Sequence, residues 1–392
     1  MAKNRIKKVV KVKDEETEMG TRTLVFTFVA MILLSLFIYF LTDVMKKKEA
    51  SKKQEEIVDP VEETEPLAEE VQEQEEELED ITVTDMAGRE VTLPANVESI
   101  ATFGSIGVIN AFVELMGSGD KIANDMTHRF SNSDKWAMQY EFAPQMKGAP
   151  VLENTDGELL IEDVLALDPD LCLVMSKDYI EPLESNGLNV VYFEWKETED
   201  VKTAVTLMGE ALQKQDIAED YLNYFDEMVA EAEALTADVG ENKKTVLYGN
   251  VTQFTQPHII AEWWISAAGG DSVTKDSWVN NKSVYTQEDI LKWDPDVMIV
   301  TDVATIDEIK NDSLYSDVSA VKNDEVYYIP TVAHVWGNRT VEQPLTIFWT
   351  LHKLYPDLIT EEDLAEKIEC FYSHFFKTEL SEGQVNSIIH TN

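Results

Sequence analysis

A duplicated segment is the strongest constraint on the fold of this chain of 392 residues. Residues 162–174 read EDVLALDPDLCLV and residues 288–300 read EDILKWDPDVMIV; seven of the 13 positions are identical, at an offset of 126 residues. Each copy predicts an amphipathic helix, a break at Asp-Pro-Asp and a buried strand, because proline cannot extend a helix and disfavours helical geometry in the residue before it. Two copies so far apart predict two similar α/β lobes and not a solenoid.

The rest of the chain from residue 81 onward alternates short apolar runs with helical stretches. Residues 81–94 alternate apolar and polar side chains around a turn, which predicts a β-hairpin. Further strands are predicted at 97–103, 171–175, 189–193, 245–249, 297–301 and 326–330. This alternation is typical of parallel sheets. The predicted fold class is therefore α/β, with two Rossmann-like lobes that each contain a central, mostly parallel sheet.

A long helical stretch separates the two lobes. Residues 218–237 contain no glycine or proline, so they can form one helix of about 30 Å at 1.5 Å per residue. The prediction is an N-terminal lobe at 81–198, connecting helices at 199–240, and a C-terminal lobe with C-terminal helices at 241–392. One uninterrupted helix between the lobes is a stiff connector.

The N-terminal region predicts a membrane anchor. Residues 24–41 are uncharged and lack proline and glycine, so we expect a transmembrane helix at 23–42, with a cleaved signal peptide as the alternative. Seven Lys and Arg lie in residues 1–22 and five in 43–53, which favours a cytoplasmic tail at 1–22 and an extracytoplasmic folded part. Residues 43–80 are expected to be an acidic, disordered tether, since 14 of the 26 residues at 55–80 are acidic. The expected location is the cell membrane, with a single pass.

Charge and missing motifs exclude several functions. The formal charge of −43 excludes a nucleic-acid binder, and two cysteines cannot build a disulfide scaffold or a structural zinc site. No phosphate-binding loop, HExxH, GxSxG, CxxC or GxGxxG motif is present, and no nucleophile and base form a recognisable pair. We therefore expect no catalytic residue, no resident metal and no cofactor.

The candidate ligand-binding residues lie in loops that follow predicted strands, where open α/β sheets bind ligands. In the N-terminal lobe they are Phe103, Ser105, Lys177 and Trp195; in the C-terminal lobe they are Gln253, Phe254, His334, Trp336 and Arg339. An imidazole, an indole and a guanidinium within six residues suit an anionic or metal-chelate ligand, which they can stack on and hydrogen-bond. The alternative is a solvated loop whose tryptophan caps the core.

Taken in order, these segments resemble a known family. The hairpin ITVTDMAGREVTLP, the strand, loop and helix at 97–117, the paired repeat units, AAGG at 267–270 and QPLTIFWTLHKLYP at 343–356 resemble the iron-complex and cobalamin substrate-binding proteins of ABC importers. The resemblance spans about 81–378. It implies two lobes joined by a rigid helix, a ligand between them, and delivery to a permease dimer with its ATPase. It also implies that Glu162 and Glu288, one per lobe, dock onto basic residues of the permease; the alternative is that each carboxylate stabilises the first turn of its helix.

The sequence thus predicts a membrane-anchored, extracytoplasmic substrate-binding protein that captures an iron–siderophore or a similar metal chelate. Haem, cobalamin, a nickel complex and a small oxyanion remain alternative ligands. Two other classes of function stay open: a metal-dependent or redox enzyme on a similar two-lobe scaffold, and a sensor ectodomain.

Overall fold

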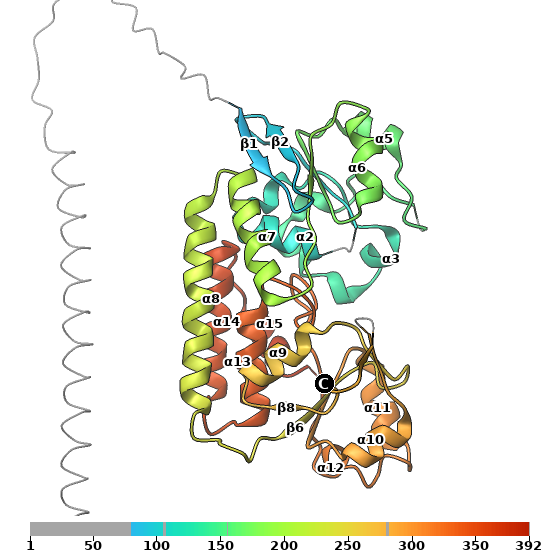
Figure 1. The fold of residues 1–392 in the computed structure, drawn as a ribbon, viewed down its shortest axis with the longest axis vertical. Helices are drawn as coiled ribbons and strands as arrows, with labels where there is room; N and C mark the ends of the chain where they lie inside the picture. The colour runs from blue at the N-terminus through green and yellow to red at the C-terminus, as the bar shows by residue number, and fades with distance from the viewer. Residues whose placement is uncertain (1–79, 105–106, 155, 280–281, 392) are drawn as a thin grey trace, which may run out of the picture. The chain divides into compact units, whose positions relative to one another are not determined.

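The computed structural model describes residues 80–104, 107–154, 156–279 and 282–391, all within one unit of the chain, Glu76–Asn392 (Figure 1). The predicted cytoplasmic tail, transmembrane anchor and all but the last residue of the tether lie outside these ranges. Within them, no helix combines the length and the hydrophobicity that crossing a bilayer requires.

The first half of the described chain forms a parallel sheet preceded by a hairpin. Strands β1 (Ile81–Thr84) and β2 (Glu90–Leu93) pair antiparallel, as the alternation of apolar residues predicts. Strands β3 (Ile100–Thr102), β4 (Leu171–Val174) and β5 (Val190–Tyr192) follow one another in a three-stranded parallel sheet. Every residue of β4 is buried, which is why its sequence is a continuous apolar run. The helices of this half are α2 (Val108–Leu115), α3 (His128–Ser131), α4 (Gln139–Phe142), α5 (Ile161–Leu167) and α6 (Ile180–Glu184), with 3-10 turns at Gly119–Lys121, Asp134–Trp136, Pro144–Met146 and Lys177–Tyr179.

The second half forms a second parallel sheet. Strands β6 (Thr245–Gly249), β8 (Asp271–Ser272), β11 (Val297–Val300) and β12 (Val326–Tyr328) are arranged in the order β12-β11-β6-β8. A small antiparallel sheet, β7-β10-β9, was not predicted, because strands of two or three residues show no periodicity; its strands are β7 (Thr255–Gln256), β9 (Trp278–Val279) and β10 (Lys282–Val284). The helices are α9 (Ile260–Ala267), α10 (Gln287–Trp293), α11 (Ala304–Asn311) and α12 (Ser319–Lys322). The predicted α/β fold with parallel sheets is confirmed.

The repeated segment forms the same structure twice. Helices α5 and α10 each end on the first aspartate of the motif, Asp168 and Asp294, which adopt left-handed φ angles of 51° and 45°. The last aspartate of each motif then binds the start of the neighbouring strand. Asp170 accepts hydrogen bonds from the backbone N–H of Glu98 and Ser99, just before β3. Asp296 accepts from the backbone N–H and hydroxyl of Thr245, the first residue of β6.

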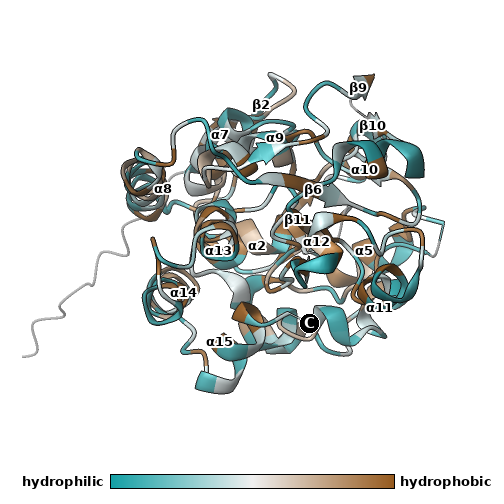
Figure 2. Ribbon diagram, turned by 90° about the horizontal axis from the view of Figure 1, so that it is seen from below, coloured by the Kyte–Doolittle hydropathy of each residue, from teal (hydrophilic) through white to brown (hydrophobic). Residues whose placement is uncertain are grey.

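Helices form a bundle beside the two sheets. The connecting helices are α7 (Thr198–Ala211) and the uninterrupted α8 (Gln215–Thr236), and the C-terminal helices are α13 (Gln343–Leu354), α14 (Glu361–Phe375) and α15 (Glu382–Ile389). Helix α13 contacts α8, α9 and α14, and α14 contacts α15 (Figure 1). Figure 2 shows hydrophobic and hydrophilic residues on different sides of α8 and α14, as expected for helices that bury one face.

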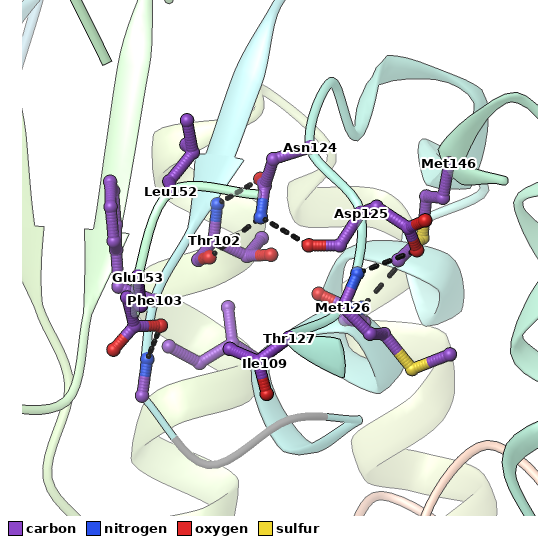
Figure 3. Close-up of a pocket in the computed structure, with 12 residues that line it drawn as sticks. Thr102, Phe103, Ile109, Asn124, Asp125, Met126, Thr127, Met146, Leu152 and Glu153 are labelled. Atoms are coloured by element: carbon purple, nitrogen blue, oxygen red, sulfur yellow. Dashed lines mark hydrogen bonds between the residues drawn. The ribbon is translucent and has the colours of Figure 1, made fainter. Parts of the chain in front are cut away.

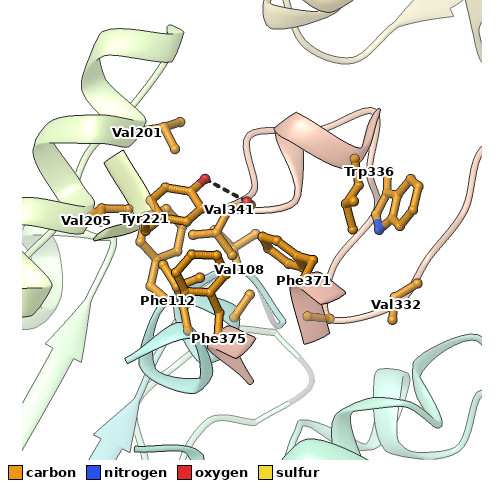
Figure 4. Close-up of a cluster of buried hydrophobic side chains, with 14 of the residues drawn as sticks. Val108, Phe112, Val201, Val205, Tyr221, Val332, Trp336, Val341, Phe371 and Phe375 are labelled. Atoms are coloured by element: carbon orange, nitrogen blue, oxygen red, sulfur yellow. Dashed lines mark hydrogen bonds between the residues drawn. The ribbon is translucent and has the colours of Figure 1, made fainter. Parts of the chain in front are cut away.

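One hydrophobic cluster joins both halves of the chain. It includes residues of both parallel sheets, such as Leu171 and Val297, and residues of the bundle, such as Phe225 and Phe348. Part of it is drawn in Figure 4, where side chains of α2, α7, α8 and α14 surround the segment between β12 and α13. A shared core of this kind opposes independent movement of the two sheets.

Candidate ligand-binding site

The loops that follow the strands of the first sheet present charged and aromatic side chains. Lys177, after β4, lies with its ammonium 5.1 Å from the ring centroid of Tyr192 and 3.8 Å from a carboxylate oxygen of Glu194, after β5. Tyr192 donates its hydroxyl proton to Glu194, and Lys196 lies 3.1 Å from the same carboxylate. The hydrogen bond from Lys196, followed by that from Tyr192, lowers the pKa of Glu194. This edge therefore combines an exposed lysine pair with an ionised carboxylate.

A small polar pocket lies at the end of β3 (Figure 3). Asn124 fixes the strand end, because its amide oxygen accepts from Thr102 N at 2.8 Å and its amide nitrogen donates to Thr102 O at 3.1 Å. The carboxylate of Glu153 accepts from Gly104 N at 3.2 Å and from the Tyr179 hydroxyl at 2.7 Å. Burial raises the pKa of Glu153. The cavity volume is about 10 Å³, so it can hold a water molecule but not a chelate.

The loop between β12 and α13, residues 331–341, is called the ligand loop below. Three of its candidate residues have distinct surroundings. Trp336 is completely buried, and its indole N–H donates to Glu342 at 2.9 Å, so its ring faces the core in this conformation. His334 is only 6% exposed and stacks on Trp136, with ring centroids 5.5 Å apart. Arg339 is partly exposed.

Reciprocal hydrogen bonds between Arg339 and Trp195 connect the two halves of the chain. The Trp195 indole N–H donates to the carbonyl of Arg339 at 3.0 Å, and the Arg339 guanidinium donates from Nη1 to the carbonyl of Trp195 at 2.5 Å. Burial lowers the pKa of Arg339. No carboxylate within the described ranges lies close enough to form an ion pair with this guanidinium. Its Nε and Nη2 atoms donate no hydrogen bond there either, so they are available to an acceptor.

His258, just before α9, lies near enough to Arg339 to respond to its charge, and it was not among the candidates from the sequence. Burial, followed by the positive charge of Arg339, lowers the pKa of His258 to about 4, so its imidazole is neutral at pH 7. No motif marks His258 in the sequence, because it shares no ligand-like spacing with another histidine, cysteine or carboxylate. A neutral imidazole beside a guanidinium adds a second polar group that can meet a ligand.

The segment that contains α3 and α4 crosses from the first half onto the second. Besides the Trp136–His334 stack, the Lys135 ammonium lies 3.4 Å from the carbonyl of Thr301, and the Gln139 amide donates to the carbonyl of Ala333 at 2.5 Å. This segment therefore covers the ligand loop from one side.

The remaining predicted residues lie apart from this contact. Phe103 is buried and packs edge-on against Tyr179, 6.1 Å away. Gln253 is exposed and Phe254 packs against Tyr285; neither is joined by a hydrogen bond or ring contact to the other candidate residues that the structure describes. Ser105 lies outside the described ranges.

Glu162 and Glu288 are both exposed, each in the first turn of its helix, α5 and α10. Over the described ranges, no three His, Cys, Asp or Glu side chains come together as a metal site.

The fold and the paired loops define a class of two-sheet binding proteins, and comparison with known families agrees. The model of the periplasmic binding protein family matches residues 122–333, more than half of the chain, and the chain belongs to that family. The resemblance inferred from the sequence is therefore confirmed.

Two curated relatives match parts of the chain. The molybdate-binding protein MolA of Haemophilus influenzae is 30% identical over 94 residues, which cover 23% of this chain and 27% of that protein. The iron(3+)-hydroxamate-binding protein YxeB of Bacillus subtilis is 22% identical over 200 residues, which cover 45% of this chain and 60% of that protein. The chain thus matches less than two thirds of the length of either relative.

Solved structures match over more of the chain. A periplasmic solute binding protein from Veillonella parvula has a TM-score of 0.70 and 24% identity, over 79% of this chain and 97% of that one. MolA of Haemophilus influenzae bound to molybdate has a TM-score of 0.65 and 19% identity, over 77% of this chain and 99% of that one. At these identities the likeness establishes the fold.

Proposed function

We propose that this protein is the extracytoplasmic substrate-binding component of an ABC importer and captures a metal complex that presents oxygen acceptors between the loops of its two sheets. The observation that supports it best is Arg339. Its guanidinium lies at the contact between the halves, is partly buried, and keeps two donor atoms without a partner in the described part of the chain. Burying such a cation is unfavourable, and the negative charges of Asp200 and Glu194 offset this only in part, so an acceptor that completes the hydrogen bonds of the guanidinium would be favourable.

The proposed ligand class is a metal centre surrounded by oxygen atoms. Molybdate and an iron(3+)-hydroxamate complex, the ligands in the names of MolA and YxeB, both present metal-bound oxygens that accept hydrogen bonds. Arg339 and the neutral imidazole of His258 would donate to these oxygens, and Lys177 would add positive charge at the opposite edge. The protein acts by binding and release, without catalysis.

Delivery to a permease is proposed to use the two repeat helices. Glu162 of α5 and Glu288 of α10 are exposed at equivalent positions. Three residues further along, Leu165 and Leu291 are each 42% exposed, which gives each helix the same carboxylate and apolar pair. Two equivalent surfaces suit a partner with two-fold symmetry. The segment at 23–42 is proposed to anchor the protein in the membrane, with residues 43–80 as a tether.

The experiment is a titration followed by tryptophan fluorescence, with molybdate and a ferric trihydroxamate as probes and haem and cobalamin as competitors. Arg339→Met should weaken binding of the preferred probe by about 10- to 150-fold, because a hydrogen bond to a charged group is worth about 1.5–3 kcal/mol. Lys243→Met is the control, since it also removes an exposed cation, and Lys243 lies before the first residue of β6, at the opposite end of the strand from the loops that follow the sheet. Equal affinity in both variants, or binding of haem or cobalamin alone, would exclude the proposed ligand class.

A further inference from the structure

A buried carboxylate binds several donors of the ligand loop. The loop has only turns, bends and an isolated bridge between Thr331 and Val335. Glu342, at the start of α13, accepts hydrogen bonds at both carboxylate oxygens. The donors are Ala333 N at 2.9 Å, His334 N at 2.8 Å, Trp336 Nε1 at 2.9 Å, the Thr340 hydroxyl at 3.0 Å and the Tyr372 hydroxyl. All but the last donor belong to the loop.

Hydrogen-bond donors surround the carboxylate of Glu342. The residue is completely buried, and no Lys or Arg in the described ranges forms an ion pair with it. The polar groups that face it are donors, so the ionised form satisfies all of them, and the N-terminus of α13 adds a favourable dipole. Burial raises the pKa of Glu342, and the hydrogen bonds oppose that rise.

A second buried carboxyl, Glu114 of α2, lies near enough to respond to this charge. Burial, followed by the charge of Glu342, raises the pKa of Glu114 well above its usual value. Glu114 also accepts a hydrogen bond from the Gln139 amide. Glu342 accepts from five donors, so it is the better stabilised of the two as a carboxylate.

Other contacts fill space around the loop but do not replace this carboxylate. Val332, Trp336 and Val341 are buried in the core (Figure 4), and the Tyr221 hydroxyl donates to the carbonyl of Val341 at 2.6 Å. Thr346 donates to the carbonyl of Trp336 at 2.9 Å. These contacts involve side chains and carbonyls, whereas Glu342 accepts from the N–H groups of Ala333 and His334.

We infer that Glu342 is a positioning residue of the binding site: its carboxylate fixes the ligand loop so that His334 and Arg339 meet the first half of the chain in a preformed arrangement. The consequence for ligand affinity rests on the proposed function, but the consequence for the loop does not. Glutamine keeps the size of the side chain, yet it accepts at one atom only and would point an amide N–H₂ group at other donors.

The first test is hydrogen–deuterium exchange of the ligand-free protein, read over residues 331–341. Glu342→Gln should speed exchange there about tenfold or more, because buried donors lose their acceptor. The matched control is Glu262→Gln, since Glu262 also accepts from three side chains, Gln256, Thr274 and Trp278, but none belongs to the loop. The control should leave exchange over 331–341 unchanged. Unchanged loop exchange in folded Glu342→Gln would overturn the inference.

Two milder variants keep the test decisive if Glu342→Gln does not fold. Tyr372→Phe and Thr340→Val each remove one donor to Glu342, and Thr340→Val should speed loop exchange about two- to fivefold. Tyr372→Phe, which removes a donor that lies in α14 and not in the loop, should have a smaller effect on the loop. Equal protection of the loop in Thr340→Val and the original protein would count against the inference.

The second test measures affinity for molybdate and for a ferric trihydroxamate in the same variants. Glu342→Gln should bind the preferred probe about tenfold more weakly, while Glu262→Gln should bind it normally even if its melting temperature falls by a similar amount. A loosened loop with unchanged affinity would refute the positioning role. If the unmodified protein binds neither probe, the proposed ligand class is wrong, and the exchange experiment alone still decides whether Glu342 fixes the loop.

Discussion

The duplicated Asp-Pro-Asp motif makes a quantitative prediction about stability. Asp296 accepts two hydrogen bonds from Thr245, at 2.8 and 2.9 Å, and thereby fixes the first residue of β6. A hydrogen bond to a charged group is worth about 1.5–3 kcal/mol when buried, and partial exposure of Asp296 reduces this to about 1–2 kcal/mol each. Asp296→Ala should therefore lower the free energy of unfolding by about 2–4 kcal/mol. Asp170→Ala should have a similar effect, because Asp170 binds two N–H groups before β3 in the same way.

The assay is urea unfolding followed by tryptophan fluorescence, with calorimetry for the melting temperature. A loss of about 2–4 kcal/mol corresponds to a decrease of about 3–6 °C for a folded unit of this size, at an unfolding entropy of about 2.1 cal/mol/K per residue. Asp168→Asn is the matched control, since Asp168 accepts no hydrogen bond through its side chain in the described structure and asparagine tolerates its left-handed φ of 51°. We expect the control to change stability by less than about 0.5 kcal/mol. If Asp296→Ala were as mild as Asp168→Asn, the last aspartate of the motif would not hold the sheet.

Three further predictions concern pH, uptake and movement. Burial raises the pKa of Glu114 well above 4.5, so the stability that its protonated form provides at acid pH should be lost as pH rises through the folded pKa. In urea titrations, Glu114→Gln should reduce this loss of stability with pH. An identical pH profile in both proteins would contradict the prediction. The double variant Glu162→Ala, Glu288→Ala should bind ligand normally but fail to support uptake. The single variants should show partial defects in uptake, because exposed ion pairs are worth about 0–1 kcal/mol each. Normal transport by the double variant would refute the docking role. Because α8 is uninterrupted and the core is shared, small-angle scattering should show little compaction when molybdate or a ferric trihydroxamate binds, and a large decrease in radius of gyration would be inconsistent with a rigid connector.

The sequence determined the elements of the fold because their signals are local. Each of the predicted apolar runs contains a strand of the structure, and the segment predicted as one helix at 218–237 lies within α8 to within one residue. The repeat also identified α5 and α10 as equivalent, since helix, proline break and strand follow one another within 13 residues. The order and spacing of these segments were sufficient to recognise the family.

The tertiary structure alone decided which residues meet. Trp195 and Arg339 are 144 residues apart, and no periodicity in the chain reports their reciprocal hydrogen bonds. Trp336 could not be assigned from the sequence either, because an aromatic residue after a strand can contact a ligand or pack in the core. In the structure its ring is buried in the core. Glu342 reads as an ordinary acidic residue before a helix until the fold brings Tyr372 and the N–H groups of the ligand loop to it. Four of the donors to Glu342 lie within nine residues of it, but only the folded loop turns them toward its carboxylate, and the fifth, Tyr372, comes from α14.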